Sequence, residues 1–427
     1  MKAVTVFGAG DLRVVEVEDP QAGSGQVRVA MEWGGICGSD LGYWKHGATG
    51  TAILREPLVL GHEVAGRIDQ IGDGVEGLEI GQAVTFNPAT LVGDHVMPAH
   101  LEGRDNLWPE VRYFGSAAFL PHEQGGFSTY RVVRAEQIRP LPDSVSTRHG
   151  AVAEPLGVAI HAVGRAGNVA GKRVLVNGAG PIGALVVAAA KHAGAGEVWA
   201  ADLSAPALAV AAGMGADRVV DRSAGEELPQ DVDVAFDASG APRALGDVFL
   251  AVVRGGRFVQ VGNLPAGEAP VALGQLVTRE IEYVGSYRFV DEVTDAVQAM
   301  ADGLDVEPLI THTFGIDEAQ RLVGVTLLGG GKLMDEGVDE RLVGQGVCEI
   351  GRHEQCHRRV VKRSGQGRAN GAGAQRGIAK GKAVGLHLGS ETGVDRCKSA
   401  IGGCLQESTK LSLRIDDRAT HLLRGKG

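Results

Sequence analysis

Residues 173–194 read RVLVNGAGPIGALVVAAAKHAG, an apolar run followed by a glycine-rich turn and a second apolar run. In a G-x-G-x-x-G turn the first glycine permits a tight bend, the second lets the backbone approach a pyrophosphate, and the third lets helix and strand pack closely. The six residues at this spacing are Gly178, Ala179, Gly180, Pro181, Ile182 and Gly183. The stretch therefore predicts a strand, a dinucleotide-binding turn and a helix.

An acidic residue follows this turn at the distance that dinucleotide recognition requires. Asp202 ends the next strand-like run, EVWAAD, 19 residues beyond Gly183. Such an acid accepts hydrogen bonds from the adenosine ribose and would repel a 2′-phosphate. No Lys or Arg follows Asp202 until Arg218. The pattern favours NAD over NADP, and the alternative interpretation of Asp202 is a helix-capping acid.

The spacing pattern of hydrophobic residues differs between two parts of the chain. The first 90 residues alternate in short strand-like runs broken by Gly and Pro, which is typical of a β-rich domain. From about residue 147, strand-like runs alternate with helix-like ones, which predicts a parallel sheet covered by helices. The fold class expected is α/β, with a β-rich domain beside a doubly wound parallel sheet.

Composition narrows the functional classes. The chain has 427 residues, a net charge of −10 and five cysteines. This length suits two or three domains, and the cysteines are too few for a disulfide framework, so we expect a reducing, cytoplasmic compartment. The acidic balance argues against nucleic acid as a partner, and no apolar run is long enough for a membrane span. We expect a small-molecule partner.

The composition changes after Met334. Residues 335–427 hold 17 basic and 11 acidic residues, none of the 19 aromatic residues and four of the five cysteines. A segment with so little apolar surface cannot offset the entropy of ordering. We therefore expect residues 335–427 to form an irregular, disordered tail without a catalytic role.

Four residues outside the glycine-rich turn could bind a metal ion. Cys37 lies in GGICGSD, His62 and Glu63 lie in LGHEVAG, and Glu154 lies in AVAEPLG. A thiolate, an imidazole and a carboxylate suit zinc with one coordination position open for substrate. Taken one at a time, they could equally be a small buried hydrophobe, a hydrogen-bonded histidine and solvated acids.

These residues carry a resemblance. Gly61-His62-Glu63, with Gly66, Gly72 and Val75 at their spacings, resembles the zinc signature of the medium-chain alcohol and polyol dehydrogenase family, and Cys37-Gly38-Ser39-Asp40 resembles its first ligand loop. The resemblance implies a GroES-like catalytic domain over residues 1–146, a Rossmann NAD-binding domain over 147–284 and a return to the catalytic domain over 285–334, with the active site between the domains.

The resemblance also implies roles for individual residues. Cys37, His62 and either Glu63 or Glu154 would bind one catalytic zinc, and the other glutamate would support the site. Ser39 matches the hydroxyl that relays the substrate proton. Arg288 matches an arginine beside the nicotinamide and substrate, although a surface ion pair is the alternative, and Tyr43 is a candidate substrate contact.

Within this family, residues 34–63 are most similar to L-idonate 5-dehydrogenases. This similarity implies oxidation of a secondary hydroxyl of a sugar acid, with L-idonate as the expected substrate. A sorbitol- or xylitol-type polyol dehydrogenase and a catalytically silent dinucleotide-binding protein are the alternatives. The resemblance further suggests a homodimer or homotetramer formed through an edge of the Rossmann sheet, around residues 281–287.

The chain departs from the family where many members bind a second, structural zinc with four cysteines. The matching positions hold Asp94, Met97, His100 and Trp108, which cannot supply a closed tetrahedral site. We expect no structural zinc here, and packing by Met97 and Trp108 in its place.

Overall fold

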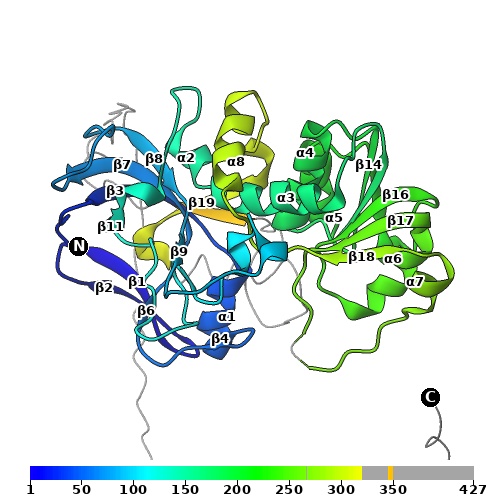
Figure 1. Cartoon of the computed structure of the whole chain (residues 1–427), viewed down its shortest axis with the longest axis horizontal. Helices are drawn as coiled ribbons and strands as arrows, with labels where there is room; N and C mark the ends of the chain where they lie inside the picture. The colour runs from blue at the N-terminus through cyan, green and yellow to red at the C-terminus, as the bar shows by residue number, and fades with distance from the viewer. Residues whose placement is uncertain (266, 320–344, 350–427) are drawn as a thin grey trace, which may run out of the picture. The chain divides into compact units, whose positions relative to one another are not determined.

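The computed structural model describes residues 1–265, 267–319 and 345–349. Two sheets dominate these residues: a largely antiparallel sheet of seven strands and a parallel sheet of six. In Figure 1 the blue and cyan strands of the first sheet are separated from the green strands of the second by the helices α3 (Ala153–Ala166) and α8 (Glu292–Ala301). The expected α/β architecture, a GroES-like β-rich domain with a Rossmann sheet, is confirmed.

The seven-stranded sheet forms the catalytic domain. Its order is β12-β8-β7-β3-β20-β19, with β11 also pairing with β3. The alternation in β3 sends Val27, Val29 and Met31 into the core of this domain. The strands of this sheet are β3 (Gln26–Gly35), β7 (Glu63–Ile71), β8 (Ala83–Phe86), β11 (Tyr130–Arg134), β12 (Ile138–Pro140), β19 (Ile310–Gly315) and β20 (Gln345–Glu349).

Shorter strands complete the catalytic domain in three small sheets, ordered β2-β1-β6, β10-β9 and β4-β5. These strands are β1 (Lys2–Gly8), β2 (Asp11–Glu16), β4 (Ala48–Thr49), β5 (Ala52–Ile53), β6 (Leu58–Val59), β9 (Ala89–Leu91) and β10 (Val111–Tyr113). The helix α1 (Gly38–His46) begins directly after Cys37, and α2 (Thr147–Gly150) precedes α3.

The parallel sheet has the strand order β15-β14-β13-β16-β17-β18, and every neighbouring pair is parallel. This order is that of dinucleotide-binding Rossmann domains, in which the ligand lies across the carboxyl ends of the strands. The strands are β13 (Arg173–Asn177), β14 (Glu197–Asp202), β15 (Arg218–Asp221), β16 (Val232–Asp237), β17 (Val252–Gln260) and β18 (Glu282–Gly285).

Helices cover both faces of the parallel sheet. In β13, Val174 and Val176 pack in the cluster that contains α3 and α4, whereas Leu175 packs in the cluster that contains α6. A strand with both faces buried needs a continuous apolar run, which RVLVN supplies. The remaining helices are α4 (Pro181–His192), α5 (Ala205–Gly213), α6 (Leu245–Ala251) and α7 (Gly274–Thr278).

The chain returns to the catalytic domain after β18. The strand β19 joins the catalytic sheet, and β20 pairs with both β19 and β3. Residues 345–349 lie in the range predicted to be an irregular tail, so for these five residues the structure differs from the prediction. Backbone pairing needs no aromatic side chains, which explains why composition did not indicate this strand. The rest of residues 335–427 lies outside the described residues.

Within the described residues, no helix is both long enough and apolar enough to cross a membrane.

Candidate active site

Three metal-ligand side chains meet where β3 and β7 lie side by side. Cys37, His62 and Glu63 each offer a ligand atom, and the three atoms lie within 4.8 Å of one another. Cys37 follows the end of β3, and Glu63 begins β7. Because the register pairs Gly35 with Glu63, the two ligand loops emerge next to each other. Thiolate, imidazole and carboxylate are together a donor set that fits zinc.

Glycine at position 35 leaves the room that the Glu63 carboxylate needs. A Cβ at Gly35 would lie 2.2 Å from Oε2 of Glu63, closer than any real contact. The side chain of Glu63 therefore lies directly over the backbone of β3. Gly35, the second glycine of GGIC, is thus part of the construction of the site.

A buried carboxylate ties the two ligand loops together. Asp40 is 2% exposed, and it accepts the backbone N–H of Cys37 at 3.0 Å and that of Gly61 at 3.2 Å. Burial raises the pKa of Asp40, although the neighbouring His62 and the two N–H groups oppose that shift. Asp40 thus fixes the backbone on either side of the three-residue cluster.

Burial and neighbouring ionisable groups shift the pKa values of Glu63 and His62. Burial, together with the neighbouring Cys37 and Glu154, raises the pKa of Glu63 well above its usual range. Burial lowers the pKa of His62, but the neighbouring Cys37, Asp40 and Glu154 raise it by more, so that it lies well above the usual value. Several acids crowded around one imidazole, out of contact with water, favour a bound cation.

Glu154 lies beside this group but bonds elsewhere. It is 5% exposed in the first turn of α3, and its Oε1 accepts a hydrogen bond of 2.5 Å from the hydroxyl of Tyr113. Burial raises the pKa of Glu154, while His62, Tyr113 and Arg288 oppose the shift. The structure therefore groups Glu63, and not Glu154, with the thiol and the imidazole.

Arg288 also lies beside Glu154, in the segment where the chain returns to the catalytic domain after β18. Its guanidinium lies 4.3 Å from the centre of the Tyr113 ring and 5.0 Å from that of Tyr287. Its backbone is in the left-handed region, with φ of 50°, which is uncommon for a residue other than glycine. The structure thus brings Arg288 next to the Tyr113–Glu154 pair rather than leaving it in a surface ion pair.

Ser39 and Tyr43 differ in their exposure to solvent. Ser39 lies in the first turn of α1, two residues after Cys37, and is partly exposed. Tyr43 is only 1% exposed, packs in the core of the catalytic domain and accepts the N–H of Ala117 through its hydroxyl. Tyr43 therefore exposes almost no surface that a substrate could contact.

The glycine-rich turn has the geometry expected of a dinucleotide site. Gly178 has φ of 91°, and a Cβ there would lie 2.5 Å from the backbone nitrogen of Ser239. A Cβ at Gly183 would lie 1.7 Å from the carbonyl oxygen of Gly178, so the third glycine lets α4 approach the turn. A Cβ at Gly180 would meet nothing within 4 Å, which leaves the amino end of α4 open to a phosphate.

Pro181 occupies the first turn of α4, where its missing N–H costs nothing, and Ile182 follows it. Asp202, at the end of β14, accepts the N–H of Ala179 at 2.7 Å and the N–H of Ser204 at 2.8 Å. Its carboxylate therefore lies directly against the glycine-rich turn. This position suits a ribose ligand. The hydrogen bond from Ser204, which precedes α5, also agrees with the alternative interpretation of Asp202 as a helix-capping acid.

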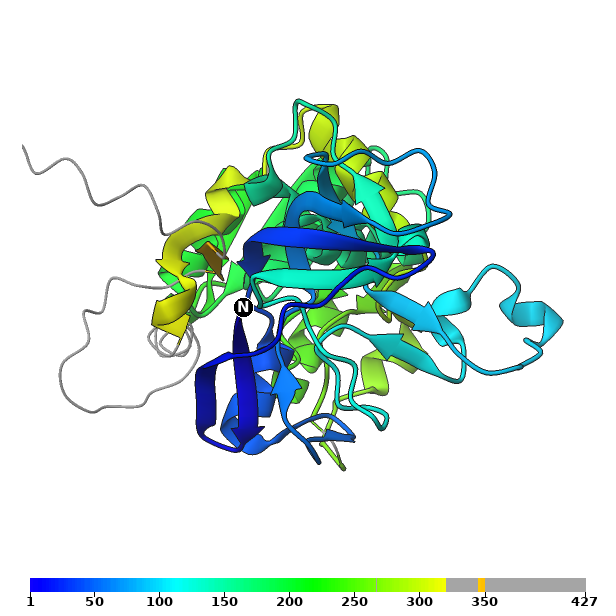
Figure 2. The same cartoon turned by 90° about the vertical axis from the view of Figure 1, so that its left-hand side faces the viewer.

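The segment between β9 and β10 projects from the catalytic domain, as the light-blue and cyan loop in Figure 2 shows. Asp94 and His100 are exposed on it. Trp108 is partly buried against the main core, donates its indole N–H to the carbonyl of Val92 at 2.8 Å and meets the His95 ring edge to face. Met97 is partly exposed.

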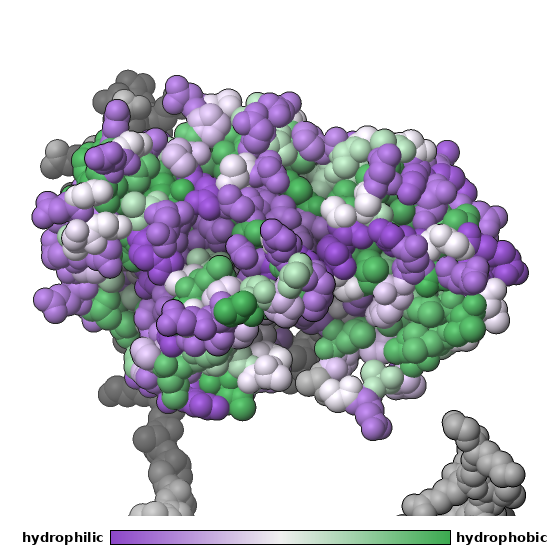
Figure 3. Space-filling model, viewed as in Figure 1, coloured by the Kyte–Doolittle hydropathy of each residue, from purple (hydrophilic) through white to green (hydrophobic). Residues whose placement is uncertain are grey.

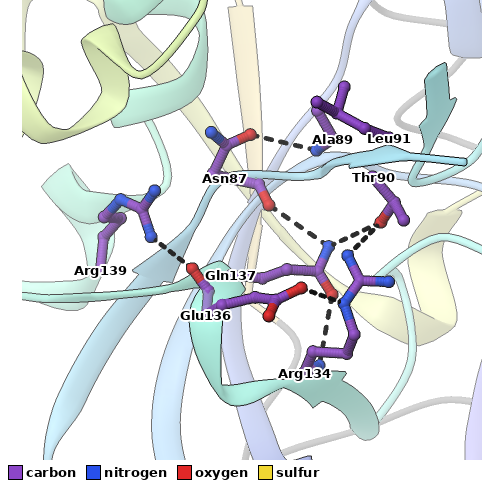
Figure 4. Close-up of a pocket in the computed structure, with 8 residues that line it drawn as sticks. All are labelled: Asn87, Ala89, Thr90, Leu91, Arg134, Glu136, Gln137 and Arg139. Carbon is purple, nitrogen blue, oxygen red and sulfur yellow. Dashed lines mark hydrogen bonds and ion pairs between the residues drawn. The ribbon is translucent and has the colours of Figure 1, made fainter. Parts of the chain in front are cut away.

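A separate hollow of about 450 Å³ opens on the catalytic domain, and Figure 4 shows the residues that line it. Arg134 bonds to Glu136 and Thr90 within it, and Arg139 bonds to Asp291. The charges of both arginines are thus already paired. The hollow contains none of the residues that the sequence singled out.

The structure brings together Cys37, His62, Glu63, Glu154 and Arg288, although they come from four separate stretches of sequence. Sequence reasoning missed two contributors. Asp40 stands in the quoted GGICGSD loop, where a polar residue beside a candidate ligand could have indicated it. Tyr113 has no such signal, because only the fold places it against Glu154.

Comparisons with known proteins agree with this arrangement. Residues 23–143 match the alcohol dehydrogenase GroES-like domain and residues 181–302 match the zinc-binding dehydrogenase domain. L-idonate 5-dehydrogenase (NAD(P)(+)) of Escherichia coli is 38% identical over 69% of this chain and 88% of its own length. Sorbitol dehydrogenase of Bacillus subtilis is 31% identical over 75% of this chain and 92% of its own.

The crystal structure of L-idonate 5-dehydrogenase from Escherichia coli superposes with a TM-score of 0.72 and 33% identity, over 82% of this chain and 98% of that one. The fold, the cluster of ligand residues and these likenesses agree. The chain belongs to the zinc-dependent medium-chain alcohol and polyol dehydrogenase family.

Proposed function

We propose that the protein oxidises a secondary hydroxyl of a sugar acid with one zinc ion and NAD, and that L-idonate, converted to 5-dehydrogluconate, is its substrate. The observation that carries the proposal is the cluster of partly buried Cys37 with buried His62 and Glu63, with Arg288 nearby. The cluster supplies the chemistry of alcohol oxidation, and the guanidinium supplies recognition of a carboxylate. A neutral polyol such as sorbitol or xylitol is the second candidate, supported by the likeness to sorbitol dehydrogenases.

In this proposal Cys37, His62 and Glu63 hold the metal, and Glu154 remains outside the group. A zinc ion held there would lower the pKa of the substrate hydroxyl, and a bound nicotinamide would supply the hydride acceptor. Ser39, partly exposed beside Cys37, receives the hydroxyl proton and passes it toward solvent. Asp40 keeps the two ligand loops in place through its two backbone hydrogen bonds.

Arg288 has the chemistry to orient a sugar acid. Its planar guanidinium can bond a carboxylate through two parallel N–H groups, which a neutral polyol cannot exploit. Stacking on Tyr113 and Tyr287 fixes the plane of the guanidinium. Arg288→Lys keeps the charge but loses the paired geometry, so it should raise KM for L-idonate about tenfold or more while leaving any polyol activity nearly unchanged.

The test of the chemistry is Cys37→Ser combined with metal analysis. The variant should lose zinc and NAD reduction together, because a hydroxyl is a far weaker zinc ligand than a thiolate. The wild type should contain one zinc per chain and reduce NAD with L-idonate. Full activity of a metal-free Cys37→Ser preparation would contradict the zinc mechanism. A wild type that binds NAD but oxidises no sugar acid or polyol would support a silent binding protein.

The same proposal includes a homodimer built through β18. This strand is the last in the parallel sheet, so one of its edges has no partner within the described residues. Figure 3 shows apolar surface gathered over the adjoining helices α6 and α7. Exposed apolar side chains there include Leu250, Leu264, Leu273 and Val277. A second copy would pair the two edges and cover this surface.

Sedimentation equilibrium tests the dimer. Val277 is 73% exposed, so Val277→Asp should lower the mass from two chains toward one without changing the unfolding temperature of the monomer. Leu203→Asp, at another exposed apolar position that is 71% exposed on the Rossmann domain, is the matched control and should leave the mass unchanged. A wild type that sediments as a monomer would exclude this assembly.

A further inference from the structure

Tyr113 makes one short hydrogen bond in the interior of the protein. Its hydroxyl donates to Oε1 of Glu154 at 2.5 Å, and the two residues are 6% and 5% exposed. Water has little access to replace this bond. A buried carboxylate that loses a donor pays the full cost of desolvation, so it must find another partner.

Aromatic and cationic neighbours hold the Tyr113 ring in place. Its centre lies 6.3 Å from that of Phe289 and 5.8 Å from that of His62, which it meets at 66°. The Arg288 guanidinium covers it at 4.3 Å. The ring thus touches a candidate zinc ligand on one side and fixes the position of the Glu154 carboxyl on the other.

The site holds more ligands than an open zinc centre needs. A catalytic zinc in an alcohol-oxidising site takes three protein ligands and keeps the fourth position for water or substrate, whereas four protein ligands make a closed structural site. Cys37, His62 and Glu63 already provide three. Glu154 bonds to Tyr113, whose ring meets that of His62 edge to face, so the Glu154 carboxylate lies next to the group and something must keep it from becoming the fourth ligand.

We propose that Tyr113 is the positioning residue that does this: its hydroxyl holds Glu154 off the Cys37–His62–Glu63 group and so reserves one coordination position for substrate. The inference rests on the proposed zinc-dependent function. Removing the Tyr113–Glu154 hydrogen bond should therefore tighten metal binding rather than weaken it.

Tyr113→Phe tests the claim on the metal-loaded, full-length protein. Without the hydroxyl, the Glu154 carboxylate turns to the metal, so zinc release to a chelator should slow by about tenfold or more. The kcat should fall because the substrate position is filled. With cobalt in place of zinc, the visible absorption band should shift. The double variant Tyr113→Phe/Glu154→Gln should regain the release rate and the spectrum of the wild type.

Tyr283→Phe is the control, because Tyr283 also donates its hydroxyl to a side-chain oxygen, that of Gln260, but in the Rossmann domain. It should leave zinc release and the cobalt band unchanged. Glu154→Gln alone gives an independent measurement. It should release zinc at nearly the wild-type rate, because the residue at 154 is already held off the metal.

Each result has a definite meaning. Faster or unchanged zinc release in Tyr113→Phe, with an unchanged cobalt band, would overturn the inference, since that is what loss of a merely structural contact produces. Much faster release in Glu154→Gln would do the same by making Glu154 a direct ligand. A wild type that retains no metal would instead refute the proposed function, and the inference with it.

Discussion

Asp40 accepts a hydrogen bond from the backbone N–H of Gly61, 21 residues further along the chain and 3.2 Å away. Its other carboxylate oxygen accepts the N–H of Cys37 at 3.0 Å. One buried side chain therefore joins the loop that carries the thiol to the loop that carries His62 and Glu63. The relative position of Cys37 and the His62–Glu63 pair therefore depends on this joint.

Asp40→Asn should weaken the site without removing a ligand. An amide must present its NH₂ group to one of the two backbone donors, so one of those hydrogen bonds is lost and the loops can separate. Zinc affinity should fall about 10- to 100-fold, the usual effect of losing a partner that supports the ligands. Competition with a chelator measures it. Asp94→Asn, on the exposed loop, is the control, and equal affinities in the two variants would show that the joint is unimportant.

Two glycines that flank Cys37 offer a matched pair of substitutions. Gly35→Ala places a methyl group 2.2 Å from Glu63 Oε2, whereas a Cβ at Gly38 meets nothing within 4 Å. Gly35→Ala should displace the Glu63 carboxylate, cost about 1–3 kcal/mol of stability and reduce zinc affinity. Gly38→Ala should leave zinc affinity unchanged and should not lower stability, because alanine is more favourable than glycine in a helix. Thermal unfolding and zinc titration of both variants make the comparison, which fails if they behave alike.

The parts of this protein that sequence predicts well are those with local determinants. The glycine-rich turn fits within six residues, and its geometry follows from sterics at Gly178 and Gly183. The predictions of a β-rich domain and of alternating strands and helices likewise rest on the spacing of hydrophobic residues that are close in sequence. The choice between Glu63 and Glu154 is not local, because it depends on the register that pairs Gly35 with Glu63.

Two side chains show why the rest could not be predicted. Tyr113 and Glu154 are 41 residues apart, and no spacing rule connects a residue in β10 with one in α3. Tyr43 follows the Cys37 loop closely enough to be expected at the substrate, but it lies on the face of α1 that packs into the core. The direction of a side chain from a helix is set by tertiary packing.

Zinc binding should depend on pH in a definite direction. The pKa values of Glu63 and His62 are both raised, above ordinary values of 4.5 and 6.5, so these groups keep their protons to higher pH and zinc must displace them. Zinc affinity should therefore fall as pH falls from about 8 to 5. Calorimetry in buffers of different ionisation enthalpy should show proton release, reduced in Glu63→Gln.

The zinc-free protein should show the opposite trend. A group whose pKa is raised on folding favours the folded state at low pH, and this contribution disappears as pH rises through the folded pKa. Between pH 5 and 8, wild-type apoprotein should therefore lose more stability than apoprotein Glu63→Gln, in which one of the two groups is absent. Equal slopes of unfolding free energy against pH for the two proteins would contradict the raised pKa of Glu63.

Asp202 should set the preference between the two nicotinamide cofactors. Its carboxylate lies against the glycine-rich turn, held by the N–H groups of Ala179 and Ser204, where it can bond to a ribose and repel a 2′-phosphate. Wild-type protein should prefer NAD in kcat/KM. A hydrogen bond to a charged group contributes about 1.5–3 kcal/mol, so Asp202→Ala should lower the NAD-to-NADP ratio about 10- to 100-fold.

The control separates recognition of the ribose from support of the backbone. Asp217 also accepts a backbone N–H, that of Val198, and pairs with Lys191 elsewhere in the Rossmann domain. Asp217→Ala should reduce stability but leave the cofactor ratio unchanged, because no ligand would touch it. Asp202→Ala should lower efficiency with NAD more than with NADP, since only NADP gains from loss of the negative charge. A wild type that prefers NADP, or an unchanged ratio in Asp202→Ala, would assign this carboxylate to capping alone.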